Sequence, residues 1–544
     1  MSAALLMVIA IVSLLLGYVL YGRFIAQKLD LDTKRTTPAH TKQDGVDYVP
    51  TKAPVLMGHH FASIAGAAPI VGPIFAAVFG WVPVLLWILI GSIFLGGVHD
   101  FSSLVASIRH GGKTIGEVIE EHIGKTGKRL FLVFAWSVLV LVIAVFAHIV
   151  AQVFVKEPAT ATSSLLFIVL AIVFGLSIYR FKVPLWLSSV IGVALLLGCV
   201  VIGVRLPITQ SYDVWKVVLF VYVFFAAVTP VWILLQPRDY LSSFLLYLIL
   251  LAGVIGIFAA NPKISFPAFG GFQTELGYLF PILFVTVACS AISGFHSLVS
   301  AGTTAKQLNK EADAKPIGYG SMLIEALLGV IALITAITIL QSDYRRLITP
   351  EDGGPIGIFS SGVGGFISHL GIPEKAGVTF AALAISAFAL TTLDTATRLG
   401  RFMFQEFFED IGKLTILSNN RYVGTLATIA VAMLLTFSGT SKLLWPLFGS
   451  ANQLLASIAL LAITVWLAGL RKNNKFVKYP MYFMFCVTLT ALCFMVYKNF
   501  LAGNIALIIL SIVLLGVAIT LVIKANQSLR KIAQRVPAER GPTA

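Results

Sequence analysis

The chain has 544 residues, of which 58% are hydrophobic and only 12% are charged. Soluble domains carry about 25% charged residues, so this composition excludes a soluble protein and indicates an all-α polytopic membrane protein. The formal net charge of +15 would suit a nucleic-acid-binding protein. The basic residues, however, lie in the short loops between apolar stretches, which excludes that interpretation.

Apolar stretches long enough to cross a hydrocarbon layer as helices recur about fifteen times along the chain. We therefore predict about fifteen transmembrane helices. The stretches lie near residues 3–21, 57–80, 82–108, 130–154, 163–180, 184–204, 216–235, 240–260, 280–304, 318–341, 376–397, 421–439, 441–470, 479–499 and 503–524.

Lys and Arg residues gather in alternate loops. Cytoplasmic loops are enriched in these residues, so their positions predict a topology with the N-terminus outside and the C-terminus inside. The basic charge then faces lipid headgroups, and we expect membrane lipids rather than nucleic acid as neighbours. The inside segments are 22–56, 109–129, 180–183, 236–239, 305–317, 398–421, 471–478 and 524–544, which hold most of the 39 Lys and Arg residues.

The first apolar stretch is preceded by no basic residues and is followed by no small-residue cleavage signal. These features are not those of a signal peptide. We predict that residues 1–22 form an extra transmembrane helix and that residues 23–56 form a cytoplasmic linker.

The stretch from Gly58 to Pro73 is built to be a poor membrane helix. Two histidines open it, small residues follow, and Pro69 and Pro73 each remove a backbone donor. Such interruptions survive in a membrane only where they face protein or a wet cavity. The pattern predicts a break at Ser63–Gly66, which is either a binding site at mid-membrane depth or a kinked helix whose small residues let neighbours pack closely.

A second interrupted segment, 216–235, contains Thr229 and Pro230 and runs in the opposite direction, five spans later. Interrupted helices in corresponding positions point to a site between inverted repeats. A weaker alternative pairs Gly58-x-His60 with Gly294-x-His296. The preferred five-plus-five repeat divides the chain into a first repeat 57–204, a second repeat 216–397, a cytoplasmic loop 398–420, additional helices 421–524 and a cytoplasmic tail 525–544.

After residues 109–113, Thr114 and Glu117 have the spacing of a helix capping box. Apolar side chains then recur at helical spacing opposite several glutamates. We predict a short amphipathic helix that either lies along the membrane surface or packs on the helix bundle.

Ionisable residues inside spans are costly and by default mark a transport pathway. We interpret Arg398 as a residue that extends to the interface, with Asp394 one helical turn away as its partner. We interpret His148 as a hydrogen-bonded packing residue. The full set is His59, His60, His99, Asp100, His148, His296, Glu325, Asp394 and Arg398.

Hydroxyl side chains in segment 280–304 are spaced three or four residues apart, which predicts one stripe along a single helix. The stripe supplies ligands for Na⁺ or for a polar substrate. The alternative is ordinary helix packing, with the hydroxyls bonded to their own backbone. We favour the first interpretation, in which the stripe lines a polar cavity. The residues are Thr286, Ser290, Ser293, Ser297, Ser300 and Thr304.

The histidines have two alternative roles, as proton carriers near neutral pH or as metal ligands together with Asp100. Adjacent helical residues point about 100° apart, so His59 and His60 are poorly placed to share one ion, and we favour proton or substrate contact. The sequence contains no nucleotide-binding loop or hydrolase motif. We therefore predict a protein that is not an enzyme, with an intramembrane enzyme or a metal-binding protein as the alternative.

Five motifs resemble the signature of the CstA carbon starvation protein family, in family order over most of the chain: residues 58–73, 97–101, 109–113, 293–304 and 393–398. The resemblance implies a multi-pass secondary transporter of the bacterial inner membrane with LeuT-like inverted repeats. It further implies import of peptides or pyruvate-like small carboxylates during carbon starvation, without a cofactor, coupled to a cation gradient of H⁺ or, less favoured, Na⁺.

Carried onto this chain, the resemblance implies that the broken helices offer backbone amides to a carboxylate. The histidines and Asp100 would serve coupling or substrate binding. The predicted site comprises His59, His60, Ser63, Gly66, His99, Asp100, Thr229, Ser290, Ser293, His296, Ser297 and Asp394.

Overall fold

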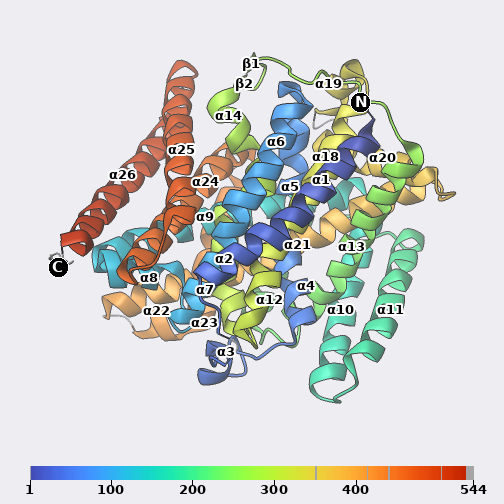
Figure 1. Ribbon diagram of the computed structural model, residues 1–544. Helices are drawn as coiled ribbons and strands as arrows, with labels where there is room; N and C mark the ends of the chain where they lie inside the picture. Colours follow the sequence, from blue (N-terminus) through green and yellow to red (C-terminus); the bar gives the residue numbers. More distant parts are fainter. Residues whose placement is uncertain are drawn as a thin grey trace.

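The computed structural model describes residues 2–32, 34–349, 352–412, 415–438, 441–503 and 505–534. These residues form a helix bundle with a two-stranded antiparallel hairpin, β1 (Gln273–Thr274) and β2 (Gly277–Tyr278), at its upper end in Figure 1. Short helices connect the long ones: α3 (Pro38–Thr41), α8 (Ile115–Ile123), α17 (Ala305–Gln307), α19 (Gln341–Leu347), α20 (Gly354–Ser368) and α22 (Thr415–Asn419).

Within the described residues, 11 helices are long and apolar enough to cross a membrane, or 12 when one bent pair counts as a span. Three of them contain π-helical turns: α1 (Ala3–Leu16) with α2 (Gly22–Lys28), α6 (Trp81–Gly91) with α7 (Gly97–Arg109), and the helix that ends in α18 (Ser321–Ile337). The others are α9 (Lys125–Lys156), α10 (Pro158–Tyr179), α11 (Leu185–Arg205), α13 (Leu235–Ala260), α21 (Glu374–Ile411), α24 (Ser441–Gly469), α25 (Lys475–Leu501) and α26 (Ile505–Gln534).

The multi-pass helical architecture is as predicted, and four of the predicted spans depart from straight helices of full length. Residues 57–80 form the bent pair, and residues 280–304 are broken into short helices. The other two are α12 (Tyr212–Val228) and α23 (Arg421–Phe437), each with 17 residues.

The break predicted at Ser63–Gly66 is confirmed. Helix α4 (Ala53–Ile64) ends there, and α5 (Ala68–Ala76) continues through a 3₁₀ turn (Ala77–Phe79) at 44° to it. Pro69 lies in the first turn of α5, where a missing N–H leaves no hydrogen bond unmade. The proline therefore starts the second half-helix instead of destroying it.

A second break lies in residues 280–304, and it corrects the predicted stripe on a single helix. Helices α14 (Leu279–Thr286), α15 (Ala288–Ala291) and α16 (Gly294–Val299) are separate, with extended backbone at Ile292 (φ −161°, ψ 129°) and Ser293 (φ −128°, ψ 128°). The hydroxyls before and after this break do not share one helical face.

Thr229 and Pro230 do not interrupt a span, contrary to the prediction. Helix α12 ends at Val228, Thr229 has an extended backbone, and α13 begins at Leu235 after a turn. Proline and the residue before it disfavour helical geometry, so here they terminate a helix between two spans.

The two broken helices meet with their backbones in contact. The Ser290 hydroxyl donates to the Pro69 carbonyl (3.0 Å). A Cβ atom on Gly72 would lie 2.4 Å from the Thr286 carbonyl oxygen, so a glycine is required for this approach. Close backbone approach through small residues is the usual means of packing membrane helices.

Helix α8 begins after its predicted N-cap, Thr114, whose hydroxyl accepts from the Gly116 N–H (3.3 Å). Ile115, Val118 and Ile119 are buried, and the helix packs on α9, α24 and α26. Of the two alternatives, the structure therefore has the helix packed on the bundle.

Candidate functional site

The bundle interior holds many ionisable side chains with almost no exposed surface. A buried charge is costly unless it is paired and hydrogen-bonded, so each of these residues needs a partner from another helix. They are His59, His60, His99, Asp100, Arg238, Asp239, His296, Glu325, Asp394 and Arg398, each at most 2% exposed.

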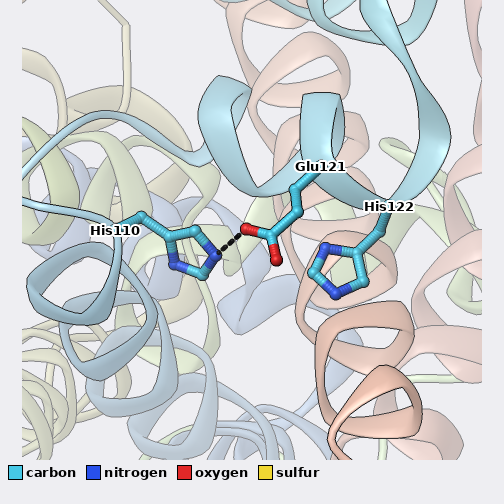
Figure 2. A group of neighbouring side chains, drawn as sticks. All are labelled: His110, Glu121 and His122. Atoms are coloured by element: carbon cyan, nitrogen blue, oxygen red, sulfur yellow. Dashed lines mark ion pairs between the residues drawn. The ribbon is translucent and has the colours of Figure 1, made fainter.

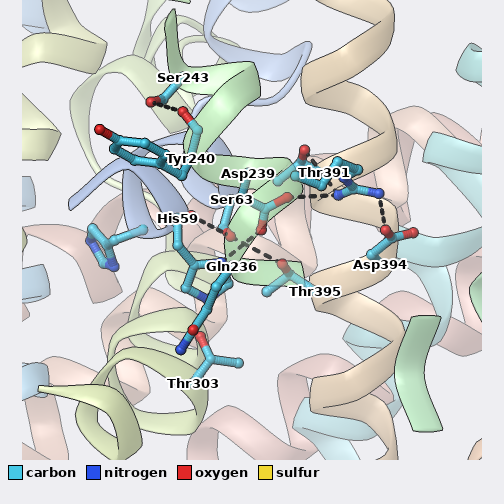
Figure 3. Close-up of polar contacts among 12 residues, drawn as sticks. His59, Ser63, Gln236, Asp239, Tyr240, Ser243, Thr303, Thr391, Asp394 and Thr395 are labelled. Atoms are coloured by element: carbon cyan, nitrogen blue, oxygen red, sulfur yellow. Dashed lines mark hydrogen bonds and ion pairs between the residues drawn. The ribbon is translucent and has the colours of Figure 1, made fainter. Parts of the chain in front are cut away.

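A first network ties α4 to α13 and α21 (Figure 3). His59 Nδ1 donates to Asp239 Oδ2 (2.6 Å), and Arg238 donates to Asp239 Oδ1 (2.8 Å). Arg238 also forms an ion pair with Asp394, which accepts a hydrogen bond from the Tyr222 hydroxyl (2.6 Å). One guanidinium thus lies between two carboxylates and compensates much of their buried charge.

Threonines of α21 complete this network at the broken end of α4. Thr391 accepts from Arg238 (3.0 Å), Thr395 is hydrogen-bonded to the Ser63 hydroxyl (3.0 Å), and Thr392 donates to the Ser63 carbonyl (3.1 Å). A helix end leaves carbonyls without partners, and Thr392 supplies one. A Cβ atom on Gly66 would lie 2.7 Å from the Thr392 hydroxyl, so glycine lets α21 approach the break.

A second network joins α7, α16 and α18. His99 Nδ1 donates to Asp100 Oδ1 (2.7 Å), and His296 Nδ1 donates to Asp100 Oδ2 (2.9 Å). Both Nδ1 atoms therefore carry hydrogen, which leaves each neutral ring with a lone pair on Nε2. His296 Nε2 lies 3.4 Å from Glu325 Oε2, so two acceptors face each other unless a proton lies on one of them.

The second network also leaves buried polar atoms without hydrogen bonds. Among the described residues, Nε2 of His60, His99 and His296 and both carboxylate oxygens of Glu325 have none. Unsatisfied buried atoms are rare in folded proteins and each requires an explanation such as an ion or a ligand. His60 joins this region through a hydrogen bond from its Nδ1 to Thr304 (2.8 Å).

Helix α24 supplies the partners at the second break. The Asn452 side chain accepts from the Phe295 N–H (2.8 Å) and donates to the Ser293 hydroxyl (3.1 Å), while Gln453 donates to the Ile292 carbonyl (3.1 Å). Side-chain amides thus replace the hydrogen bonds that a continuous helix would make.

A cavity of about 400 Å³ reaches both breaks. Ala68 at the start of α5, Cys289 on α15 and Asn452 on α24 line it, together with Phe494 and Lys498 of α25. Leu276, in the turn of the β-hairpin, also lines it, so the cavity extends from the breaks toward the end of the molecule that carries the hairpin.

Arg398 and Asp394 do not pair with each other, contrary to the interpretation from their spacing. Arg398 is fully buried and pairs with Asp47 of the linker (2.7 Å), as does Arg401 (2.9 Å). Burial alone would raise the pKa of Asp47, but the guanidinium groups of Arg401 and Arg398 outweigh it and lower the pKa to about 2. Asp47 therefore keeps its charge and fastens the linker to α21.

The predicted site residues thus fall into two networks and the second break, with two exceptions. Thr229 lies apart, half-buried, with its hydroxyl bonded to the Phe225 carbonyl (2.7 Å), and Ser297 bonds to the Gly294 carbonyl of its own helix (2.7 Å). The interpretation of His148 as a hydrogen-bonded packing residue is confirmed by its contact with Gln152 (2.9 Å).

Sequence reasoning did not select several residues that the structure brings into the site. The sequence places Arg238 and Asp239 in the short inside segment 236–239, between the apolar stretches 216–235 and 240–260. The available signal was an adjacent pair of opposite charges, Arg238 and Asp239, directly before an apolar stretch. Nothing in the sequence marks the partners that come from distant helices, namely Tyr222, Thr391, Thr395 and Asn452.

The fold and interior define a class: polytopic helical membrane proteins in which broken helices meet beside buried, paired charges, as in secondary transporters. The chain belongs to the family described as carbon starvation protein CstA, whose profile it matches over residues 2–353 and 348–491. The predicted family is therefore confirmed.

Curated relatives carry transporter names. The chain is 36% identical over 510 residues to the peptide transporter CstA of Bacillus subtilis, covering 85% of this chain and 84% of that protein. It is 34% identical over 568 residues to the pyruvate/proton symporter BtsT of Escherichia coli, covering 87% and 78%. The chain is thus a membrane transporter rather than an enzyme, and the alternative built on the His/Asp cluster has no support.

A solved structure supports the fold alone. The Eremococcus coleocola manganese transporter, in complex with an aromatic bis-isothiourea substituted compound, matches with a TM-score of 0.51 at 14% identity. The match covers 90% of this chain and 99% of that one.

We expect Arg238→Met to destabilise the protein strongly, because it leaves the Asp394 carboxylate buried without its cation. Breaking a buried pair in this way costs about 3–5 kcal/mol. Thermal unfolding of the detergent-purified protein measures the change, and adding Asp394→Leu to Arg238→Met should recover part of it.

Arg345→Met is the matched control, since Arg345 pairs with Glu275 at an exposed site where a salt bridge is worth about 0–1 kcal/mol. Equal unfolding temperatures for the Arg238→Met and Arg345→Met variants would contradict the expectation.

Proposed function

We propose that the chain is a proton-coupled symporter that imports peptides or pyruvate-like small carboxylates across the bacterial inner membrane. The observation that carries the proposal is the buried chain of His99, Asp100, His296 and Glu325. The names of the relatives, a peptide transporter and a pyruvate/proton symporter, support the substrate classes.

The second network supports protons as the coupling ion. His296 Nε2 faces Glu325 Oε2 at 3.4 Å, and this pair is stable only with a proton on one partner. Loss of that proton would set a carboxylate against a lone pair in a buried site, where such repulsion is strong. Proton occupancy can therefore bias how α16 and α18 pack, which is the requirement for coupling.

The substrate carboxylate is proposed to bind where the cavity reaches the breaks. Free backbone N–H groups at the start of a half-helix attract anions, and the start of α5 at Ala68 lines the cavity. The volume of about 400 Å³ lies within the usual range of small-molecule sites.

We propose that the inverted repeat pairs the segment of Gly58 and His60 with the segment of Gly294 and His296, which was the weaker of the two pairings in the sequence. Helices α4–α13 then correspond to α14–α24, so that each half begins with a broken helix and ends in a hairpin, α12–α13 or α23–α24. Helices α10 and α11, at the lower right edge in Figure 1, are an insertion in this scheme. Helices α1–α2 precede the repeats, and α25–α26 follow them.

The topology with the N-terminus outside and the C-terminus inside can be tested with single cysteines in a variant in which the native cysteines are replaced by serine. We expect His369→Cys, in the exposed loop before α21, to react with a membrane-impermeant maleimide on intact cells. Asn473→Cys, between α24 and α25, should react only after permeabilisation. The reverse labelling pattern would overturn the topology.

Uptake into proteoliposomes tests the proposed activity. We expect pyruvate or di- to tetrapeptides to accumulate when the outside is made acidic, and a protonophore to abolish accumulation. An inward Na⁺ gradient at equal pH on both sides should drive no accumulation. A response to neither gradient would exclude symport.

Variants of the second network test the coupling site. Asp100→Asn and Glu325→Gln keep the side-chain shapes but remove the groups that hold the proton. We expect both to lose accumulation under a pH gradient while retaining substrate exchange between equal pools. The retained exchange separates loss of coupling from loss of the fold.

His148→Gln is the control, because His148 contacts Gln152 and Tyr212 rather than the network. This variant should accumulate substrate as the unmodified protein does. Full accumulation by Glu325→Gln would refute the coupling role of that residue.

A further inference from the structure

One cluster of potential metal ligands lies away from both networks, at the surface where α8 packs. It is the one group of three or more His, Cys, Asp or Glu side chains, within the part of the chain that the structure describes, whose ligand atoms all lie within 4.8 Å of one another. Its members are His110, which follows α7, and Glu121 and His122 in the last turn of α8 (Figure 2).

The two imidazoles are held differently. His110 directs its Nε2 at Glu121, whereas His122 has its Nδ1 on the Glu121 side and its Nε2 against Gly469 of α24 (Figure 2). His110 Nδ1 lies 2.6 Å from the Ala106 carbonyl, and His122 Nδ1 lies 3.2 Å from the Val118 carbonyl. A carbonyl oxygen only accepts hydrogen bonds, so each Nδ1 carries hydrogen and each neutral ring has its lone pair on Nε2. Histidine ligands in proteins are usually fixed by such a backbone contact on the other nitrogen, and His110 has this orientation. His122 would bring its Nε2 to the cluster by turning its ring over, which gives up the contact with Val118.

The carboxylate of Glu121 faces one of these lone pairs. Glu121 Oε2 lies 3.0 Å from His110 Nε2 (Figure 2), and two acceptors at this distance need a cation between them, either a proton or a metal ion. The neighbouring glutamates are engaged elsewhere, because Glu117 and Glu120 both pair with Lys128. Glu121 is the carboxylate of α8 that turns to the imidazoles.

We propose that His110, Glu121 and His122 bind a divalent transition-metal ion of the Zn²⁺ class. Two imidazole nitrogens and one carboxylate oxygen suit Zn²⁺ or Co²⁺, whereas Mg²⁺ and Ca²⁺ take oxygen ligands. Binding would draw the ligand atoms to about 3.3 Å from one another, as tetrahedral Zn–N distances require. Glu121, whose side chain is 62% exposed, has room to make this movement.

The position of the cluster indicates what the ion would restrain. The His110 ring packs edge-on against Trp466 of α24, with 6.0 Å between ring centroids. The His122 carbonyl accepts a hydrogen bond from Ser528 of α26. A metal ion would therefore clamp the end of α7 to α8 and to the C-terminal helices. Helix α7 also carries His99 and Asp100, but metal binding at this cluster does not depend on their role.

Calorimetric titration with ZnCl₂ tests the site on the full-length protein, purified in detergent without a polyhistidine tag and stripped with a chelator. We expect one Zn²⁺ per chain and a rise in unfolding temperature on binding. With CoCl₂, visible absorption should report tetrahedral coordination. His110→Ala with His122→Ala should abolish binding, and Glu121→Gln should weaken it at least about tenfold.

Two control variants keep the outcome decisive. Glu120→Gln removes a carboxylate one position away that pairs with Lys128, and His369→Ala removes an exposed histidine with the same backbone contact at Nδ1. Both should bind Zn²⁺ as the unmodified protein does. The proposal is overturned if the unmodified chain takes up no more Zn²⁺ than the double histidine variant, which would leave an ordinary imidazolium–carboxylate pair.

Discussion

The structure depends on one constraint: a polar group inside an apolar layer must find a partner within the protein. Each break in a membrane helix frees backbone carbonyls and amides, and here other helices supply partners for them. Thr392 of α21 donates to the Ser63 carbonyl at the first break. Asn452 and Gln453 of α24 bind the backbone at the second. The contacts that permit the breaks therefore also determine which helices surround them.

The buried charges form two networks with different properties, one around Arg238 and one around Asp100. Around Arg238, two carboxylates, a tyrosine and a threonine surround one guanidinium, and such a compensated network holds α13 against α21. Around Asp100, two histidines share one carboxylate while Glu325 has no hydrogen bond among the described residues. The Arg238 network also leaves Arg238 Nε and Asp394 Oδ1 without hydrogen bonds, but its carboxylates are paired with a permanent cation. Glu325 has no such cation, so the second network is the one that can respond to a proton.

The two ends of the bundle differ. At the end that carries α3, the linker is fastened by Asp47 to Arg398 and Arg401, and Gln236 joins Thr51 to Gln307. Toward the β-hairpin, the cavity of about 400 Å³ extends from the breaks. The α3 end has a hollow as well, lined by Asp47, Arg401 and Tyr422 among others. The two ends therefore differ in their side chains: ion pairs and side-chain amides at one, and mostly apolar residues around the cavity at the other.

Composition and local pattern by themselves determined that this is a polytopic helical protein. They also determined that a membrane helix is interrupted after Ser63, because prolines and small residues act on their own backbone. The family followed from motifs that are contiguous in sequence. Only the tertiary structure decided the second break, since Ile292 and Ser293 carry no proline and are held extended by Asn452 and Gln453. It also decided the partners of Asp394 and Arg398, which spacing assigned to each other. Their actual partners, Arg238 and Asp47, come from segments more than 150 residues away in each case. A buried charge pairs with an opposite charge that the tertiary fold brings beside it, and the spacing of residues in the sequence does not indicate which residue that is.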